Sequence, residues 1–447
     1  MTTQALPPAA KQSGIFYGWW IVLVSVLLMA TIFGTIVNAF SLFIKPVIGD
    51  IPSITIAMFT IAYTVITSIA IPFSPIVGNL LRRFDARWIV SVGVVLAALA
   101  NLGLSMTSNV IWLYLMAGVQ GIAITFATTL PISAMVTNWF YRHRGLALGL
   151  ATAGSGLGGV IFVPLILNAL LPSLGWRGTY LALGAVQIVL LLPLSLLVLR
   201  TRPEDKGLLP LGHEELLAAQ AAAGTTVRPG LTQGQVLRSP AFWALGAALI
   251  FSGISVNGMI SNFAPILGSL QSPTAIVGFI LGSVGLFVMG AKFLAGWLYD
   301  RLSLILAIAL ISLANAAQFF FMLKPDSMVS AVMFNLLHGF GATMVTITPA
   351  YLAGKLFGDR DYAAVYGWVS TFALLGAAIA PIFGGFFYGS SKETSGLANA
   401  QSLVWAWLVM GLVGFVLYLV TVRLKPHWEP TDQPVGADPV APAEVRH

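Results

Sequence analysis

The sequence contains no cysteine, and only 8% of its 447 residues are charged. Without cysteine there is no disulfide, no thiolate metal site and no cysteine nucleophile. A soluble domain carries about 25% charged residues, so the low charge excludes an ordinary soluble globular protein. The chain is 58% hydrophobic, with a mean hydropathy of +0.91. This composition predicts an all-α integral membrane protein.

The sequence also lacks enzyme signatures. HExxH, GxSxG and a phosphate-binding lysine loop are all absent. We therefore expect no enzymatic activity, no catalytic residues, no cofactor and no metal. The net charge of +7 sits in short loops between apolar segments, which indicates membrane orientation rather than nucleic-acid binding.

Twelve apolar segments of about 20 residues or more are expected to cross the membrane as helices. They cover residues 17–44, 54–80, 88–107, 110–136, 145–172, 178–199, 241–270, 274–299, 303–323, 328–354, 362–389 and 400–422. An even number places both termini on one side. With the termini inside, inner loops and tails hold 17 of the 22 Lys and Arg residues and outer loops hold four. The positive-inside rule then places both termini in the cytoplasm.

One long polar stretch, Thr201–Ser239, divides the segments six and six. It contains a short candidate helix, His213–Ala223. The predicted organisation is a cytoplasmic tail (1–16), a six-helix bundle (17–200), a cytoplasmic linker (201–239), a second six-helix bundle (240–423) and a disordered cytoplasmic tail (424–447).

The two halves repeat each other. Three pairs of residues lie 218 positions apart and a fourth lies 217 apart: Gly78 and Gly296, Pro131 and Pro349, Gly149 and Gly367, and Pro164 and Pro381. Four pairs at nearly one offset indicate internal duplication. A parallel repeat of six spans is the plan of the major facilitator transporters, which bind substrate near the membrane midplane between the halves.

Lys292 lies well inside the segment 274–299, where a charge costs about 2.5–3.5 kcal/mol. At about 100° per residue, Gly285, Met289 and Gly296 share its face of the helix. Small residues belong where helices pack, so Lys292 is expected to face protein. The alternative is a lysine that snorkels to the helix end, roughly 10 Å away; its face of the helix argues against this.

The loop pattern GxxxD(R/K) resembles the major facilitator signature, whose Asp–Arg pair latches the cytoplasmic side in one state. The second copy is complete, as Gly296, Asp300 and Arg301. The first copy has Gly78 but places Arg82 at the acidic position, with Asp85 three residues later. The first copy is either a rearranged latch or a basic loop that follows the positive-inside rule.

Further motifs are similar to the monocarboxylate transporter and oxalate:formate antiporter branch of that superfamily, over Phe16 to Arg423. They are Tyr17-Gly18-Trp19-Trp20, Asn138-Trp139-Phe140, Tyr141-x-x-Arg144-x-x-Ala147-x-Gly149-x-x-x-Ala153-Gly154-Ser155-x-x-Gly158, Arg202-Pro203-Glu204-Asp205-x-Gly207 and Phe242-Trp243. The resemblance implies a small carboxylate substrate and a basic residue in the eighth span, where Lys292 stands. Animal-type members carry an Asp one turn earlier, associated with proton coupling; here that residue is Val288. Arg144 joins the candidate latch residues.

The charge pattern agrees with an anionic substrate. No Asp or Glu lies deep in a span, so Lys292 has no internal counter-ion and attracts a carboxylate. The eleventh span has no Lys or Arg, which favours a single carboxylate. Other candidate substrate-binding residues are Asn38, Asn257, Asn262, His338 and Tyr366; each could instead bond a neighbouring helix.

We therefore expect a secondary transporter that moves a small monocarboxylate by alternating access. Proton symport is preferred, with Lys292 losing its proton in the empty carrier or His338 carrying it. Anion exchange and uniport stay open, and an exporter of amphiphiles is the weaker alternative. A membrane sensor is another alternative, but sensors usually carry a sizeable soluble domain, and none of the loops here is large enough to form one. The expected partners are the carboxylate, protons and membrane lipid, without nucleic acid, and the protein is expected to be a monomer in a bacterial cytoplasmic membrane.

Overall fold

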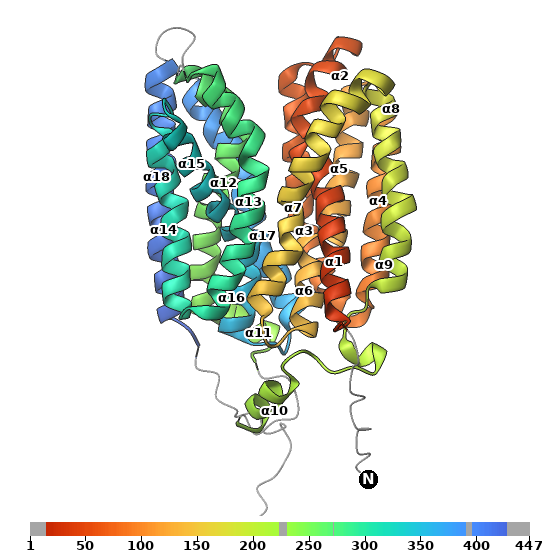
Figure 1. The fold of residues 1–447 in the computed structure, drawn as a ribbon, viewed down its shortest axis with the longest axis vertical. Helices are drawn as coiled ribbons and strands as arrows, with labels where there is room; N and C mark the ends of the chain where they lie inside the picture. The colour runs from red at the N-terminus through yellow and green to blue at the C-terminus, as the bar shows by residue number, and fades with distance from the viewer. Residues whose placement is uncertain (1–14, 223–229, 271, 390–395, 427–447) are drawn as a thin grey trace, which may run out of the picture.

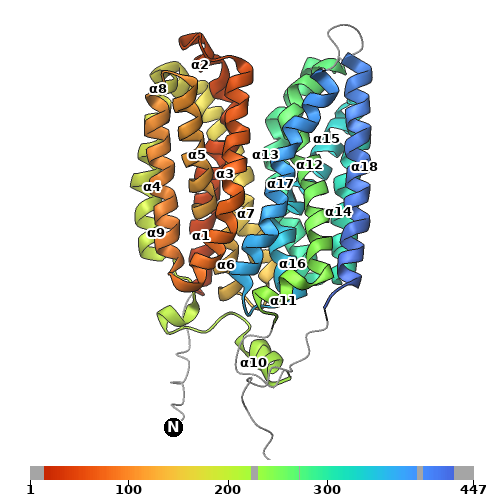
Figure 2. The ribbon, with the colours of Figure 1, turned by 180° about the vertical axis from the view of Figure 1, so that it is seen from behind.

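The computed structural model describes residues 15–222, 230–270, 272–389 and 396–426. These residues form two helical bundles side by side, and their only β-pairing is two isolated bridges (Figures 1 and 2). Helices suit a bilayer because they satisfy their backbone hydrogen bonds internally. The all-α membrane fold is confirmed. Most of the predicted tails (1–16 and 424–447) lies outside the described residues.

The N-terminal bundle runs from Gly18 to Val198. Its elements are α1 (Gly18–Leu28), η1 (Met29–Asn38), η2 (Phe40–Phe43), α2 (Ile44–Asp50), α3 (Ile56–Arg83), α4 (Ala86–Ser105), α5 (Val110–Ala127), α6 (Thr129–Trp139), α7 (Arg144–Leu165), η3 (Ile166–Leu170), α8 (Leu171–Val186), η4 (Gln187–Leu191) and α9 (Leu192–Val198). The first span ends at Asn38, earlier than predicted. The chain turns there because Phe40 packs on Phe59 and Phe43 stacks on Tyr180.

The linker and the C-terminal bundle follow. The linker holds η5 (Pro203–Lys206), α10 (His213–Ala222) and α11 (Gln233–Arg238), so the helix predicted at His213 is confirmed. The C-terminal bundle consists of α12 (Pro240–Ser269), α13 (Thr274–Arg301), α14 (Leu304–Met322), α15 (Met328–Met344), α16 (Ile347–Phe357), α17 (Tyr362–Gly389) and α18 (Gly396–Arg423).

Ten segments of the described chain are long and apolar enough to cross a membrane. One of them, Arg144–Val198, has 55 residues and would be roughly 80 Å long as a single helix, against a hydrocarbon core of about 30 Å. The chain reverses within it at Gly175, whose φ is +65°, so it makes two crossings. The bent pair α15 and α16 makes one more, which brings the described segments to the predicted twelve.

Helix starts repeat between the halves at the same offset as the sequence motifs. The N-caps of α3 and α13 are Thr55 and Pro273, those of α4 and α14 are Asp85 and Ser303, and those of α5 and α15 are Asn109 and Ser327. Every pair is 218 residues apart. Five of these six side chains accept a hydrogen bond from the first turn of their helix, which satisfies an otherwise unpaired N–H. The internal duplication therefore extends to the capping chemistry.

The duplicated glycines bring the two bundles together. Gly149 of α7 lies against Gly296 of α13, and Gly367 of α17 lies against Gly78 of α3; a Cβ on Gly149 or on Gly367 would sit 3.2 Å from the Cα of its partner. The two contacts are equivalent under the repeat. Only glycine allows backbones this close, so these positions fix where the bundles touch.

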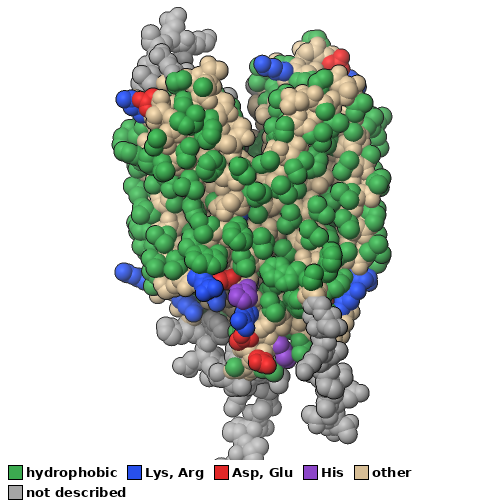
Figure 3. Space-filling model, viewed as in Figure 1, with side chains coloured by type: hydrophobic (Ala, Val, Ile, Leu, Met, Phe, Trp, Pro, Cys, Tyr) green, Lys and Arg blue, Asp and Glu red, His purple; other side chains and the backbone are tan. Residues whose placement is uncertain are grey.

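Gly78 and Gly296 lie near the ends of α3 and α13, and Gly149 and Gly367 lie near the starts of α7 and α17. These helix termini lie at the end of the molecule where α1 begins, here called the closed end (Figure 1). At the opposite end the surface is hollowed between the two bundles, as Figure 3 shows. That end is called the open end. The two bundles are thus in close contact at one end of the molecule and apart at the other.

The linker pairs with both bundles at equivalent places on the closed end. Leu211 pairs with Phe140 after α6, and Gly230 pairs with Gly358 after α16. Phe140 and Gly358 are again 218 residues apart. Leu211 N donates to Trp139 O at 2.9 Å, and Leu231 N donates to Phe357 O at 2.8 Å. The linker therefore contacts the loop that follows the fourth span of each half.

Candidate functional site between the bundles

Lys292 lies in the contact between α7 and α13, the seam that joins the two bundles. Its side chain is 1% exposed, so it faces protein as predicted and does not snorkel. Its Nζ donates to the Ser155 hydroxyl at 2.7 Å and to the Thr152 carbonyl at 3.3 Å. Both acceptors belong to α7, in the opposite bundle, and both are uncharged.

The antiparallel packing of α7 and α13 explains this geometry. The Lys292 backbone lies level with Gly149, whose added Cβ would sit 2.5 Å from Lys292 O. A helical side chain leans toward the N-terminus of its own helix, which for α13 is the open end. The ammonium therefore reaches Thr152 and Ser155, further along α7 toward the open end.

Asn38 joins the same group of residues. Its Nδ2 donates to the Ser155 carbonyl at 2.7 Å. Asn38 ends η1, a π-helical stretch, and such wide turns are frequent at functional sites. Asn38, Ser155 and Lys292 thus form a connected chain across three spans, and two of these residues were predicted from the sequence.

The other candidate substrate-binding residues lie elsewhere. Asn257 donates to Gly253 O of its own helix α12 at 3.0 Å. Asn262 lies in α12, but its side chain is outside the described residues. Tyr366 is buried beside Ser133 of α6, near the start of α17 at the closed end. Neither Asn257 nor Tyr366 is a hydrogen-bond partner of Lys292.

His338 is buried inside the C-terminal bundle, in a hydrogen-bonded network. Its Nδ1 lies 2.7 Å from Gln318 Oε1, and Gln318 Nε2 donates to Asn315 Oδ1 at 2.7 Å. The N-terminal bundle holds a similar network, in which Gln120 Nε2 donates to Asn101 Oδ1 at 3.4 Å. Gln120 and His338 are 218 residues apart. This correspondence makes His338 part of a duplicated helix-to-helix contact.

Asp300 closes the seam at its other end. Its carboxylate accepts the backbone N–H groups of Gly145 and Leu146, each at 2.8 Å. These groups open α7, and the N-terminus of a helix favours an anion. Arg301 is exposed, and the structure gives it no ion pair among the described residues. Of the predicted latch pair, Asp300 therefore binds the N-terminus of α7 in the other bundle, and Arg301 does not take part in this contact.

A buried ion pair lies beside this contact. Arg144 donates from Nη1 and Nη2 to the two oxygens of Asp359, at 2.9 and 2.7 Å. Both side chains are 8% exposed, and the pair joins the start of α7 to the loop before α17. Burial and the nearby Asp359 carboxylate raise the pKa of Tyr141, so this phenol stays neutral and offers its ring to Arg144 at 5.8 Å.

The incomplete first copy of the signature also crosses the interface. Arg82 lies 3.4 Å from Asp361, in the loop before α17, and is half-exposed. Asp85 instead caps α4 and accepts from the Thr201 hydroxyl at 3.0 Å, so it stays within its own half. The first copy is therefore a rearranged contact. At the end of α13, the acidic Asp300 binds the N-terminus of α7. At the equivalent end of α3, the basic Arg82 lies beside Asp361, just before α17.

Sequence reasoning missed Ser155, Asp359 and Asp361 as functional candidates. Ser155 stands in the quoted Ala153-Gly154-Ser155 stretch, so a signal was present. The two acids precede the eleventh span in Gly358-Asp359-Arg360-Asp361. Nothing in that spacing shows that they face cations of the other half, because the packing of the bundles decides it.

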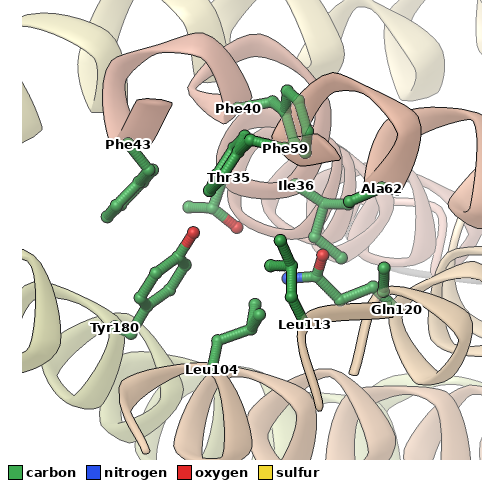
Figure 4. A pocket seen from close by; sticks show the side chains of 11 residues that line it. Thr35, Ile36, Phe40, Phe43, Phe59, Ala62, Leu104, Leu113, Gln120 and Tyr180 are labelled. Atoms are coloured by element: carbon green, nitrogen blue, oxygen red, sulfur yellow. The ribbon is translucent and has the colours of Figure 1, made fainter. Parts of the chain in front are cut away.

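A separate small cavity lies within the N-terminal bundle, between residues of η1, η2, α3, α4, α5 and α8 (Figure 4). Its volume is about 10 Å³, which is room for one water molecule. Thr35, Gln120 and Tyr180 supply its polar groups among apolar walls. It is too small for an organic anion and has no charged lining residue, so the seam remains the candidate site.

Comparison with known proteins identifies a family and several relatives that this chain resembles. A family model described as Major Facilitator Superfamily matches residues 14–355 and 304–447. "Monocarboxylate transporter 11" of Homo sapiens is 32% identical over 242 residues, which are 51% of this chain and 45% of that protein. The "Oxalate:formate antiporter" of Oxalobacter formigenes is 22% identical over 94% of each chain.

Solved structures agree at the level of the fold. The proton:xylose symporter XylE superposes with a TM-score of 0.66 at 15% identity, over 92% of this chain and 96% of that one. A bacterial homologue of the lysosomal transporter Spinster, in an inward-facing conformation, gives a TM-score of 0.58 at 16% identity, over 92% of this chain and 98% of that one. At these identities the likeness concerns the fold alone.

Proposed function

Because this chain belongs to the Major Facilitator Superfamily of transporters, we propose that it carries a small monocarboxylate anion across the membrane by alternating access. The observation that carries the proposal is Lys292, a lysine buried between the bundles with only uncharged acceptors. The names of its relatives, among them a monocarboxylate transporter and an oxalate:formate antiporter, point to the same substrate class.

The charges around Lys292 support one carboxylate. A buried charge is costly unless it is paired, so an anion that enters the seam supplies what the protein does not. Asp300 is eight residues away along α13, roughly 12 Å, and is already bound to the N-terminus of α7. Among the described residues of α17 there is no Lys or Arg that would pair with a second carboxylate.

The location proposed is a bacterial cytoplasmic membrane with both termini in the cytoplasm. Basic side chains gather around the closed end, as Figure 3 shows on one face, and loops rich in Lys and Arg stay inside. The structure then represents the outward-open state. Arg144–Asp359 and Asp300 with the α7 N-terminus seal its cytoplasmic side.

Proton linkage is proposed through Lys292. In this scheme Lys292, which faces no counter-ion in the empty carrier, gives up its proton there and takes one up again together with the anion. The loaded carrier is then electrically neutral at this site. His338 is a weaker candidate because its Nδ1 already lies 2.7 Å from Gln318 Oε1, in the network within the C-terminal bundle. Exchange of anions is the alternative, with Lys292 permanently charged.

The test is uptake of labelled formate, acetate, lactate or pyruvate into liposomes that contain the purified protein, with a pH-sensitive dye inside. Lys292→Ala should abolish uptake and binding, whereas Lys292→Arg should keep part of both, because guanidinium changes the hydrogen-bond geometry. Lys324→Ala is the matched control, since Lys324 is 85% exposed at the open end. Full activity of Lys292→Ala would refute the proposal.

The same liposomes separate the two coupling modes. Symport predicts uptake into empty liposomes that rises with an inward proton gradient and acidifies the lumen. Uptake that needs internal anion and ignores the gradient would rule out symport and establish exchange.

A further inference from the structure

Ser155 is the point at which the two bundles and the first span meet. Its hydroxyl accepts from Lys292 at 2.7 Å, and its carbonyl accepts from Asn38 at 2.7 Å. We propose that Ser155 is a substrate-binding residue of the N-terminal bundle, which shares the carboxylate with Lys292. This inference rests on the proposed function and adds to it a specific donor in the opposite half.

The hydroxyl proton of Ser155 is available for this role. A serine hydroxyl has one proton to donate and two lone pairs, and Lys292 occupies a lone pair. Most helical hydroxyls donate back to their own helix: Thr152, one turn earlier, donates to Leu148 O at 2.7 Å. For Ser155 the structure gives no acceptor among the described residues, although the side chain is only 3% exposed.

A carboxylate that takes the place of the direct hydrogen bond can bridge the two groups. It offers two oxygens and about four lone-pair sites, so it accepts from Lys292 Nζ and from Ser155 Oγ together. Binding then replaces the direct Ser155–Lys292 hydrogen bond by two charge-assisted ones. The amide of Asn38 stands next to this position, held by the Ser155 carbonyl.

The arrangement also links binding to the two bundles. Lys292 belongs to α13 and Ser155 to α7, so one anion contacts both sides of the seam. The empty carrier holds the lysine against neutral groups, and the loaded carrier holds it against a charge. The substrate therefore changes the contact that joins the halves, which alternating access requires.

The experiment measures the Kd of the purified carrier for lactate and formate, by titration calorimetry, together with the KM and maximal rate of uptake. Ser155→Ala should raise Kd and KM roughly 10- to 100-fold, as expected for a hydrogen bond to a charged group. Ser25→Ala is the matched control, because the Ser25 hydroxyl is buried and donates to Ile21 O of its own helix α1 at 2.8 Å. Its Kd should stay within about two-fold of the parent.

Ser155→Thr distinguishes binding from packing. It retains the hydroxyl and enlarges the side chain, whereas alanine removes the hydroxyl and reduces it. A binding role predicts that threonine keeps more affinity than alanine, and a packing role in this tight seam predicts the reverse.

The outcomes separate this inference from the proposed function. Loss of binding in Lys292→Ala with unchanged Kd in Ser155→Ala would overturn the role of Ser155 and leave the function standing. Unchanged binding in Lys292→Ala would refute the function itself. Alanine is small and helix-compatible, so Ser155→Ala is expected to fold, as checked by size-exclusion profile and Tm.

Discussion

Replacing Asp359 by asparagine should open the closed end. Asp359 holds both Nη groups of Arg144, and both side chains are 8% exposed. The variant keeps the size of the side chain and removes its charge. Arg144 then stays buried without a counter-ion as long as the bundles remain in contact at this end.

The magnitude follows from the burial of the pair. Removing one partner of a buried ion pair costs about 3–5 kcal/mol, and the remaining amide oxygen of asparagine places the effect near the lower limit. The penalty falls on the closed-end state alone, because Arg144 gains water when the bundles separate. About 3 kcal/mol is roughly a 100-fold change in the equilibrium, which would take a 99:1 mixture to near 1:1.

The assay uses the absence of native cysteine. Ser133 of α6 is 0% exposed and lies beside Tyr366 of α17, so a single Ser133→Cys reporter is shielded while this end is closed. Asp359→Asn should raise its alkylation rate by a membrane-permeant maleimide by one to two orders of magnitude. Asp326→Asn, in an exposed pair with Lys324 at 3.3 Å, is the control and should change nothing. Equal alkylation rates in Asp359→Asn and the parent would refute the argument.

The same reporter tests two further contacts. Asp300→Asn should raise alkylation more than Arg82→Gln, because Asp300 accepts two backbone bonds at 2.8 Å, whereas Arg82 is half-exposed and 3.4 Å from its partner; equal effects would contradict this order. Gly296→Ala should also loosen the closed end, at a cost of about 1–3 kcal/mol, because its Cβ would meet Gly145 O and lie 3.1 Å from Gly149 Cα. A Cβ on Gly290 of the same helix would meet nothing within 4 Å, so Gly290→Ala should leave the alkylation rate unchanged. Similar alkylation rates in the two alanine variants would rule out a role for the Gly296 contact.

Most of the fold could be predicted from the sequence, because a bilayer requires long apolar helices and these are visible in the composition. Runs of about 20 apolar residues, basic loops and the 218-residue offset gave twelve crossings in two equivalent halves. The failures occur where tertiary contacts decide. The first span ends at Asn38 because Phe43 stacks on Tyr180 at 4.1 Å, a contact between segments that no local pattern relates.

The site was predictable only where a residue was out of place in its segment. A lysine within an apolar span is unusual, so Lys292 could be found from the sequence alone. A serine in a glycine-rich helix is ordinary, because small residues also serve helix packing, so Ser155 could not be found in this way. Asn38 was a candidate and joins Ser155, whereas Asn257, His338 and Tyr366 shared no common signal and lie in separate contacts.

At the closed end, the two halves share the positions of their close glycine contacts but differ in the charges that surround them. The glycine contacts Gly149–Gly296 and Gly78–Gly367 preserve the backbone approach in both halves, yet the charges at the two helix ends are reversed, with Asp300 in one and Arg82 in the other. The acids of all three charged contacts therefore belong to the C-terminal half, and their partners, Arg144, Arg82 and the α7 N-terminus, belong to the N-terminal half. Opposite charge on the two faces favours their closure at this end. Under the proposed function, an anion bound at Lys292 in the same seam would contribute to opening this end.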